Sequence, residues 1–279
     1  MYKFIVDSGS DKGKRKDHSE DYYLVTNLGY DGLLVIVADG VSGLIAGDVA
    51  SRLGSEFYSV ELIKNLADYF KMGVPKSMSL DDDLFITNAI QQSIRAANAN
   101  SRKLIKGAGT TLVSALILNN GTMYVVNIGD SRAYIINGTE IHQITRDHSV
   151  AWDSFEEEKK NYAANKSNYE EWLKNYSEFK RNFIMSHPRS HVIKNVLGYY
   201  GDIDYMDIFK LKIANGDKVL LATDGLTDLV NDYEIMKILK NNGDVSKLIN
   251  SANDKGGHDN ITAVLVNVVE SDKKEADQG

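Results

Sequence analysis

Three aspartates stand at the ends of apolar segments, where carboxylates can do chemistry. Two apolar runs lead directly into Asp39-Gly40 and Asp224-Gly225, and a third aspartate, Asp259, comes just before the apolar run 261–268. An aspartate just past a buried strand places its carboxylate at the rim of a sheet, and a following glycine permits a sharp turn or close approach to a ligand. The alternative interpretation is that each Asp-Gly pair only forms a turn.

The three aspartates together point to a bound cation. If the run 261–268 is antiparallel to the strands before Asp39 and Asp224, we expect the carboxylates to converge at one sheet edge, where they would repel one another without a cation. Carboxylates without His or Cys suit Mg²⁺ or Mn²⁺ rather than zinc. Two such ions that share a carboxylate activate water and stabilise an in-line displacement at phosphorus. The residues therefore predict a metal-dependent hydrolase and leave its substrate open.

The elements that must position these aspartates follow from the apolar pattern. Short β-branched runs bounded by Gly, Asn or Asp predict strands, and longer runs with helical spacing and no proline predict helices. Asn-Gly turns between strands predict hairpins, and strands grouped with helices inserted in blocks favour an α+β layered fold over a doubly wound one. Predicted strands lie at 33–38, 111–118, 123–128, 218–222 and 261–268, helices at 46–72 and 84–106, and turns at 119–121 and 137–138.

Composition excludes several classes of protein. The chain has 279 residues, of which 43% are hydrophobic, so one domain can bury a large core. The absence of cysteine excludes disulfides, zinc-thiolate sites and cysteine nucleophiles. A net charge of −7 argues against a nucleic-acid partner. The N-terminal residues lack the order of a signal peptide and no apolar run reaches membrane-spanning length, so we expect a cytoplasmic protein without a membrane partner.

Seven motifs follow one another in a specific order over almost the whole chain. They are GKRKDHSED at 13–21, DGVSGLIAGDVAS at 39–51, GTT at 109–111, GDSR at 129–132, DHS at 147–149, TDGLTD at 223–228 and GHDNIT at 257–262. With them the chain resembles the metal-dependent phosphatases of the protein phosphatase 2C class, particularly the compact bacterial members, over about residues 3–268. The resemblance implies two packed antiparallel sheets flanked by helices, a four-layer α-β-β-α sandwich.

The resemblance also implies roles for individual residues around two Mn²⁺ or Mg²⁺ ions. The implied ligands are Asp39, which bridges both ions, Gly40 through its carbonyl, Asp224 and Asp259 on the second ion, and Glu20 and Asp21 beside the pair, partly through water. A third, weaker ion is associated with Asp130. The chemistry then depends on the ions that Asp39, Asp224 and Asp259 hold, which makes these three the catalytic residues.

The phosphate-binding position departs from the family pattern. Ungapped alignment puts Lys16 where relatives have an arginine, and Arg15 stands one residue earlier. A guanidinium holds phosphate through two parallel hydrogen bonds, whereas lysine is a mobile point charge. Both residues are therefore candidates for phosphate binding. The alternative interpretation is that this basic run is only a solvated loop.

The resemblance implies a Ser/Thr protein phosphatase that hydrolyses phosphoserine and phosphothreonine by attack of a metal-bridging hydroxide. A partner Ser/Thr kinase is a family-level expectation. One alternative is a phosphoprotein-binding pseudophosphatase, which Lys16 allows but which leaves the repulsion among the three aspartates unexplained. A second alternative is a phosphatase of a small phosphate ester, which would require a deep, closed pocket.

The predicted domain organisation is simple. Residues 1–269 form one catalytic domain, and the charged tail 270–279 is expected to be disordered. Relatives place a flap beside the active site at about 150–190, called the flap segment below. Here it is long, and aromatic residues at helical spacing predict two amphipathic helices with a break near 165–168. Either the aromatic stripe packs against the domain, or the flap segment overhangs the site and selects protein substrates.

Overall fold

The predicted fold is confirmed by the sheet topology. The computed structural model describes residues 1–41, 46–138, 140–162, 168–199, 201–203 and 205–271. In this part of the chain the strands form two five-stranded antiparallel sheets, the first ordered β2-β3-β4-β5-β8 and the second β1-β10-β9-β6-β7. The strands are β1 Tyr2–Asp11, β2 Asp21–Asn27, β3 Gly32–Asp39, β4 Leu112–Leu118, β5 Thr122–Ile128, β6 Arg132–Asn137, β7 Glu140–Gln143, β8 Asp207–Lys212, β9 Lys218–Ala222 and β10 Ile261–Glu270.

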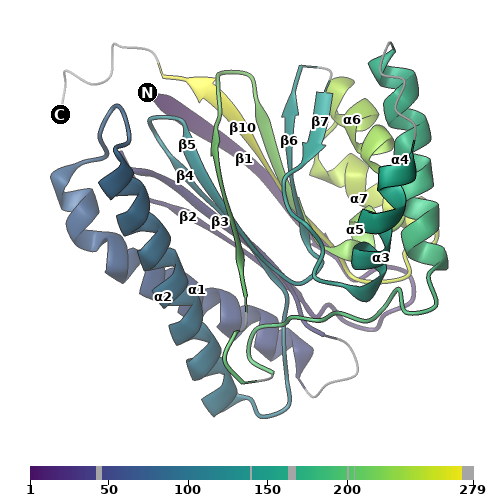
Figure 1. Ribbon diagram of the computed structural model, residues 1–279, viewed down its shortest axis with the longest axis horizontal. Helices are drawn as coiled ribbons and strands as arrows, with labels where there is room; N and C mark the ends of the chain where they lie inside the picture. Colours follow the sequence, from purple (N-terminus) through teal and green to yellow (C-terminus); the bar gives the residue numbers. More distant parts are fainter. Residues whose placement is uncertain (42–45, 139, 163–167, 200, 204, 272–279) are drawn as a thin grey trace.

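Helices cover both outer faces of the two sheets (Figure 1). They are α1 Gly47–Met72, α2 Leu80–Leu104, α3 Val150–Glu158, the 3-10 helix η1 Lys159–Asn161, α4 Tyr169–Ser186, α5 Asp224–Thr227, α6 Asp232–Lys240 and α7 Val245–Asp254. Helix α2 begins before its predicted start at residue 84 because Ser79 and Asp82 form a capping box, in which each side chain accepts a hydrogen bond from the other's backbone. No helix in the described part of the chain is long and apolar enough to cross a membrane.

The core is stacked in layers, and strand β3 shows why. Leu34 and Ile36 face the cluster under α1 and α2, whereas Val35 and Val37 face the cluster between the two sheets. Alternate residues of a strand point to opposite faces, so a strand in the middle of a sandwich must be apolar on both. Residues 33–38 are accordingly almost fully buried, which fixes the position of Asp39 at the end of the strand.

Tight turns join the central strands as predicted. The β4–β5 turn contains Asn120, whose side chain accepts a 2.8 Å hydrogen bond from the Thr122 amide, and Gly121 with a φ of 81°. The β6–β7 turn contains Gly138 with a φ of 57°. A positive φ strains residues with a side chain, so glycine is the residue these turns require.

One expectation about the aspartates is wrong. They do not meet at the edge of a single sheet, because β3 belongs to one sheet whereas β9 and β10 belong to the other. Within the second sheet β9 and β10 are antiparallel, with Ala222 opposite Ala263, so the end of β9 lies beside the start of β10 as expected. The three aspartates instead line a cavity between the ends of the two sheets.

The flap segment forms the two predicted helices, α3 and α4. Asn168 begins α4 by accepting a hydrogen bond from the Glu171 amide. Most of the predicted break, residues 165–167, lies outside the described residues, as do residues 272–279 of the predicted tail. Strand β10 continues to Glu270, one residue past the predicted boundary of the domain.

Candidate functional site

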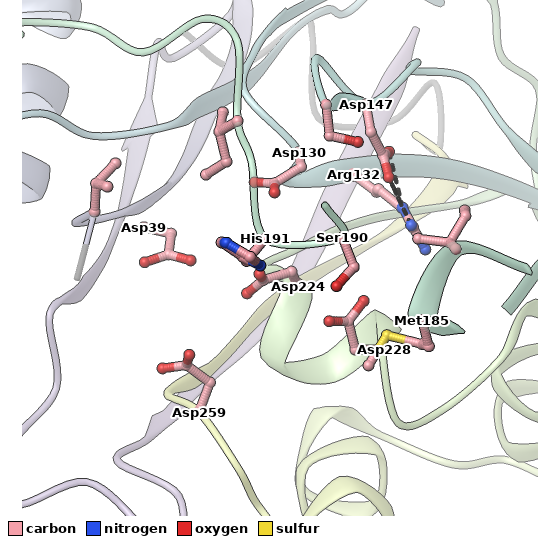
Figure 2. A pocket seen from close by; sticks show the side chains of 14 residues that line it. Asp39, Asp130, Arg132, Asp147, Met185, Ser190, His191, Asp224, Asp228 and Asp259 are labelled. Atoms are coloured by element: carbon pink, nitrogen blue, oxygen red, sulfur yellow. Dashed lines mark hydrogen bonds and ion pairs between the residues drawn. The ribbon is translucent and has the colours of Figure 1, made fainter. Parts of the chain in front are cut away.

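A cavity of about 400 Å³ lies at the end of the sandwich where the predicted aspartates meet. Figure 2 shows the side chains around it. Its described lining contains six aspartates, which are Asp39, Asp130, Asp147, Asp224, Asp228 and Asp259. Two more acidic residues lie next to the cavity. Asp21 is the first residue of β2 and pairs with Asp39 of β3, and Glu20 directly precedes it. The structure therefore brings the predicted acidic residues to one place.

The backbone of Asp39 is locked from both sides. Its amide donates to the Thr111 hydroxyl at 2.9 Å, and its carbonyl accepts from the Thr111 amide at 2.8 Å and the Thr110 hydroxyl at 2.9 Å. A Cβ on the following Gly40 would lie 2.2 Å from the Gly47 carbonyl oxygen, so only glycine fits. Gly40 therefore allows close backbone packing at the cavity wall as well as the turn that follows Asp39.

Asn260 ties the N-terminal loop to the second sheet. Its side-chain nitrogen donates to the carbonyls of Lys12 and His18, both at 2.9 Å, and its side-chain oxygen accepts from the Glu20 amide at 2.8 Å. The backbone of Asn260 also packs on Gly225. A Cβ added to Gly225 would lie 1.9 Å from the Asn260 carbonyl oxygen. These contacts bring residues 12–20, Asp224 and Asp259 together from three distant parts of the chain.

The buried carboxylates of the site repel one another and are poorly solvated. Burial is the main reason that the pKa values of Asp39, Asp130 and Asp224 lie above their usual range, and the neighbouring aspartates add to this effect. Burial together with the charges of Asp224 and Asp259 raises the pKa of Asp21 to about 7. A positive charge that enters the site therefore stabilises it.

The donor set fits a divalent cation. One carboxylate oxygen each of Asp21, Asp130 and Asp224 is buried without a hydrogen-bond partner among the described residues, which leaves these oxygens available as ligands. Among the described residues, no three Asp, Glu or His side chains are placed so that they could hold a metal ion by themselves. Mg²⁺ does not need three such ligands, because it is usually held by one or two carboxylates and keeps several waters.

The two candidate phosphate-binding cations differ in position. The Lys16 ammonium lies 2.7 Å from a carboxylate oxygen of Asp259, and its side chain is 28% exposed. Hydrogen bonding and the charges of Asp259, Glu20 and Asp39 raise the pKa of Lys16 even though burial, the largest single effect, lowers it. Arg15 is exposed, and neither Arg15 nor Lys16 is among the residues that line the cavity. Lys16 is thus the cation that the structure places beside the acidic residues.

A further cation, Arg132, lies in the cavity wall and is already paired with a carboxylate. The Arg132 guanidinium forms a buried ion pair with Asp147 at 2.6 Å and lies 5.7 Å from the centre of the Trp152 ring. Its charge lowers the pKa of Asp224 and Asp228, against the larger effect of burial on both. Arg132 therefore joins the acidic site to helix α3 of the flap segment.

Several side chains that line the cavity had no predicted role, among them Asp228 and His191. Asp228 lies one helical turn after Asp224, and burial together with the charge of Asp224 raises its pKa to about 7. The spacing of four residues within the motif TDGLTD was a usable signal, because residues four apart share one helix face. His191 also lines the cavity, in the stretch that follows α4, and no motif in the sequence marks it.

Comparisons with known proteins agree with this architecture. The family model described as protein phosphatase 2C matches residues 8–266. A serine/threonine phosphatase, Stp, from Listeria monocytogenes is 30% identical over 263 residues, which cover 92% of this chain and 93% of the relative. The crystal structure of the serine/threonine phosphatase Stp1 from Staphylococcus aureus superposes with a TM-score of 0.72 at 26% identity, covering 96% of each chain.

A further solved structure contains metal ions. The catalytic domain of the serine/threonine protein phosphatase PstP, in complex with two manganese ions, superposes with a TM-score of 0.64 at 26% identity and covers 97% of this chain and 100% of that one. The family match over most of the chain and the relative at 30% identity agree with the sheet topology and the acidic cavity. The chain belongs to the protein phosphatase 2C family.

Proposed function

We propose that this protein is a metal-dependent phosphatase that hydrolyses phosphoserine and phosphothreonine in proteins. The observation that carries the proposal is the cavity lined by six aspartates. One buried carboxylate oxygen each of Asp130 and Asp224 has no hydrogen-bond partner in the part of the chain that the structure describes. The relatives named serine/threonine phosphatase and protein phosphatase support the same activity. A binding protein without turnover gives no reason for so many buried carboxylates, because each raises the cost of burying the others.

The positions of the carboxylates support the ligand roles that the family resemblance implies. Asp39 at the end of the first sheet, and Asp224 and Asp259 from the second, would hold the proposed ions. The Gly40 carbonyl, Glu20 and Asp21 would complete the coordination, partly through water. Asp130, with Asp228 as a neighbouring carboxylate, would hold a third and weaker ion.

The protein's own side chains then position the phosphate. When bound, the ions supply an activated water for in-line attack at phosphorus and offset charge on the phosphate oxygens. Lys16, held beside Asp259, would bind a phosphate oxygen at the entrance to the acidic site. Val41 lines the cavity but carries no proton donor. The assignment of residues 1–269 as the catalytic domain, the cytoplasmic location and a partner Ser/Thr kinase stay predictions.

Hydrolysis assays test the proposed activity directly. The protein should release phosphate from a phosphothreonine peptide and from p-nitrophenyl phosphate with Mn²⁺ or Mg²⁺, and EDTA should abolish both reactions because the carboxylates alone cannot activate water. A preparation without metal-dependent release from either substrate would refute the enzyme proposal. Hydrolysis of p-nitrophenyl phosphate and small phosphate esters, with no action on the peptide, would favour the small-ester alternative.

We also propose that the flap segment contributes to the choice of substrate, because it both packs on the domain and lines the cavity. Trp152, Phe155 and Ile184 form a buried cluster between α3 and α4. Leu173 packs against the cluster under the second sheet, and Lys180 forms a buried ion pair with Asp232 of α6. Ile184 also lines the cavity, together with Met185. The packing of α4 is thus linked to the shape of the cavity wall.

Loosening this packing should alter substrate ranking. Phe155 is fully buried, with its ring centre 5.5–6.2 Å from those of Trp152, Tyr176, Phe179 and Phe183. Phe155→Ala should destabilise the flap segment by about 3–5 kcal/mol, measured by hydrogen exchange of α3 and α4. The order of kcat/KM values in a panel of phosphopeptides should then change more than the rate with p-nitrophenyl phosphate.

The control for this experiment is Phe85→Ala, because Phe85 is 44% exposed on α2 and lies away from the cavity. It should leave both the peptide ranking and the flap segment's exchange as in the wild type. A Phe155→Ala protein with rapid exchange in α3 and α4 and an unchanged ranking would show that the flap segment has no role in selection.

A further inference from the structure

A second hollow lies between helix α4 and helices α6 and α7, and none of the aspartates proposed as metal ligands lines it. It has a volume of about 690 Å³ and is bounded by α4, the α5–α6 junction and the end of α7. This hollow, called the α4 groove below, is lined by charged and titratable side chains that include Lys174, Glu178, Arg181, Glu234, Lys255 and His258. The flap segment supplies the first three, so the groove exists only because α4 is present.

The α4 groove lies beside the acidic cavity. A small pocket between them shares Met185 and Asp228 with the cavity, and shares Arg181 and Asn231 with the groove. The groove is also lined by His258, the residue directly before Asp259. Residues that flank a phosphorylated residue held in the cavity can therefore reach the groove.

The described lining of the groove includes Lys174, Arg181 and Lys255, whereas the cation in the described lining of the cavity, Arg132, is paired with Asp147. Lys174 is exposed at the rim of the groove. The Arg181 guanidinium donates to the Leu229 carbonyl at 3.2 Å, which orients the side chain and uses only one of its five N–H donors in this contact. Lys255 also reaches the Leu229 carbonyl, at 2.9 Å. Because Arg181 and Lys255 both donate to the Leu229 carbonyl, they are held at the same side of the groove.

The acidic residues in the groove are partly neutralised. Glu234 accepts from the Asn231 amide at 3.0 Å in the capping box of α6 and lies 2.5 Å from the Lys255 ammonium. Glu178 is exposed on α4. The groove therefore presents cationic hydrogen-bond donors beside a cavity that is lined with carboxylates. The protein as a whole has a net charge of −7. An acidic side chain of a substrate is repelled by the cavity and attracted by the groove.

We propose that the α4 groove binds acidic side chains of the phosphoprotein substrate, near the phosphorylated residue, through Lys174, Arg181 and Lys255. This inference rests on the proposed phosphatase activity and adds a substrate class to it. The cavity itself recognises the phosphate group, which is common to all substrates. The groove distinguishes phosphoproteins by the sequence around the phosphate, because charged contacts beside a reaction site select among partners.

The test compares two phosphothreonine peptides that differ only in their flanking residues, acidic in one and glutamine in the other. The wild type should hydrolyse the acidic peptide with a higher kcat/KM, and added salt should reduce the difference. Lys174→Glu should lower the ratio of acidic to neutral kcat/KM by about fivefold, as expected when an exposed attraction becomes a repulsion. Lys160→Glu is the matched control, since Lys160 is an exposed lysine of the flap segment outside the groove.

Equal kcat/KM values for the two peptides in the wild type would overturn the proposal, as would equal ratios in Lys174→Glu and Lys160→Glu. Arg181→Gln is a second variant and should lower the same ratio. Hydrolysis of p-nitrophenyl phosphate keeps the two levels of inference apart, because it reports on the cavity without using the groove. If this ester is hydrolysed and the peptides do not differ, the groove proposal fails and the phosphatase proposal stands.

Discussion

Replacing Asp39, Asp224 or Asp259 by alanine is expected to abolish phosphopeptide hydrolysis and leave a folded protein. The three carboxylates line one cavity, and each substitution removes part of the coordination of the proposed ions. The loss should reach at least three powers of ten in kcat, because without the ions neither the attacking water nor the developing charge is stabilised. Circular dichroism should show unchanged helix content in each variant.

Metal-dependent stability is a readout of the same site that does not need turnover. A saturating divalent ion should raise the melting temperature of the wild type by about 5 °C, as expected for ligand at about a hundred times its dissociation constant. Asp224→Ala should show a smaller rise, while Asp68→Ala is the control, because Asp68 has an 89% exposed side chain far along α1. An equal rise in the wild type and Asp224→Ala would refute the ligand assignment.

The metal-free protein should also respond to pH. Burial raises the pKa of Asp21 and Asp228 to about 7, above the usual value for aspartate in an unfolded chain. The folded state therefore binds more protons than the unfolded state between about pH 4 and pH 7, so stability falls as pH rises through this range. In EDTA the melting temperature should be lower at pH 8 than at pH 5, and divalent ions should reduce this difference.

Lys16→Ala is expected to lower kcat/KM for a phosphopeptide by about ten- to a hundredfold, as for loss of a charged hydrogen bond. The reason is the position of Lys16 against Asp259, with an N–O distance of 2.7 Å. Arg15→Ala is the matched control, since Arg15 is an exposed cation one residue earlier, and its kcat/KM should stay within about twofold of wild type.

Two further results would decide between the basic residues. Lys16→Arg should retain most activity, because a guanidinium can replace the ammonium and adds a second phosphate contact. A large loss in Arg15→Ala with none in Lys16→Ala would reverse the assignment. Wild-type kinetics in both variants would show that the run 12–16 is only a solvated loop.

The sequence by itself determined several of the main elements and the identity of the main acidic residues. The apolar run before Asp39 has strand residues only, and it forms β3 with both faces buried. The turns at Gly121 and Gly138 and the helices α1, α3 and α4 follow from local pattern and backbone preference. The acidic motifs were recognisable because each combines an aspartate with a glycine or strand end at short range.

Only the tertiary structure decided how these parts combine. Asp39 comes from one sheet and Asp224 from the other, and the pattern of a strand does not state which sheet it joins. Lys16 rather than Arg15 faces Asp259 because Asn260 holds the N-terminal loop from 240 residues away along the chain. His191 and the α4 groove likewise arise from packing of the flap segment on the domain. Such contacts depend on the relative placement of distant segments, which local spacing cannot specify.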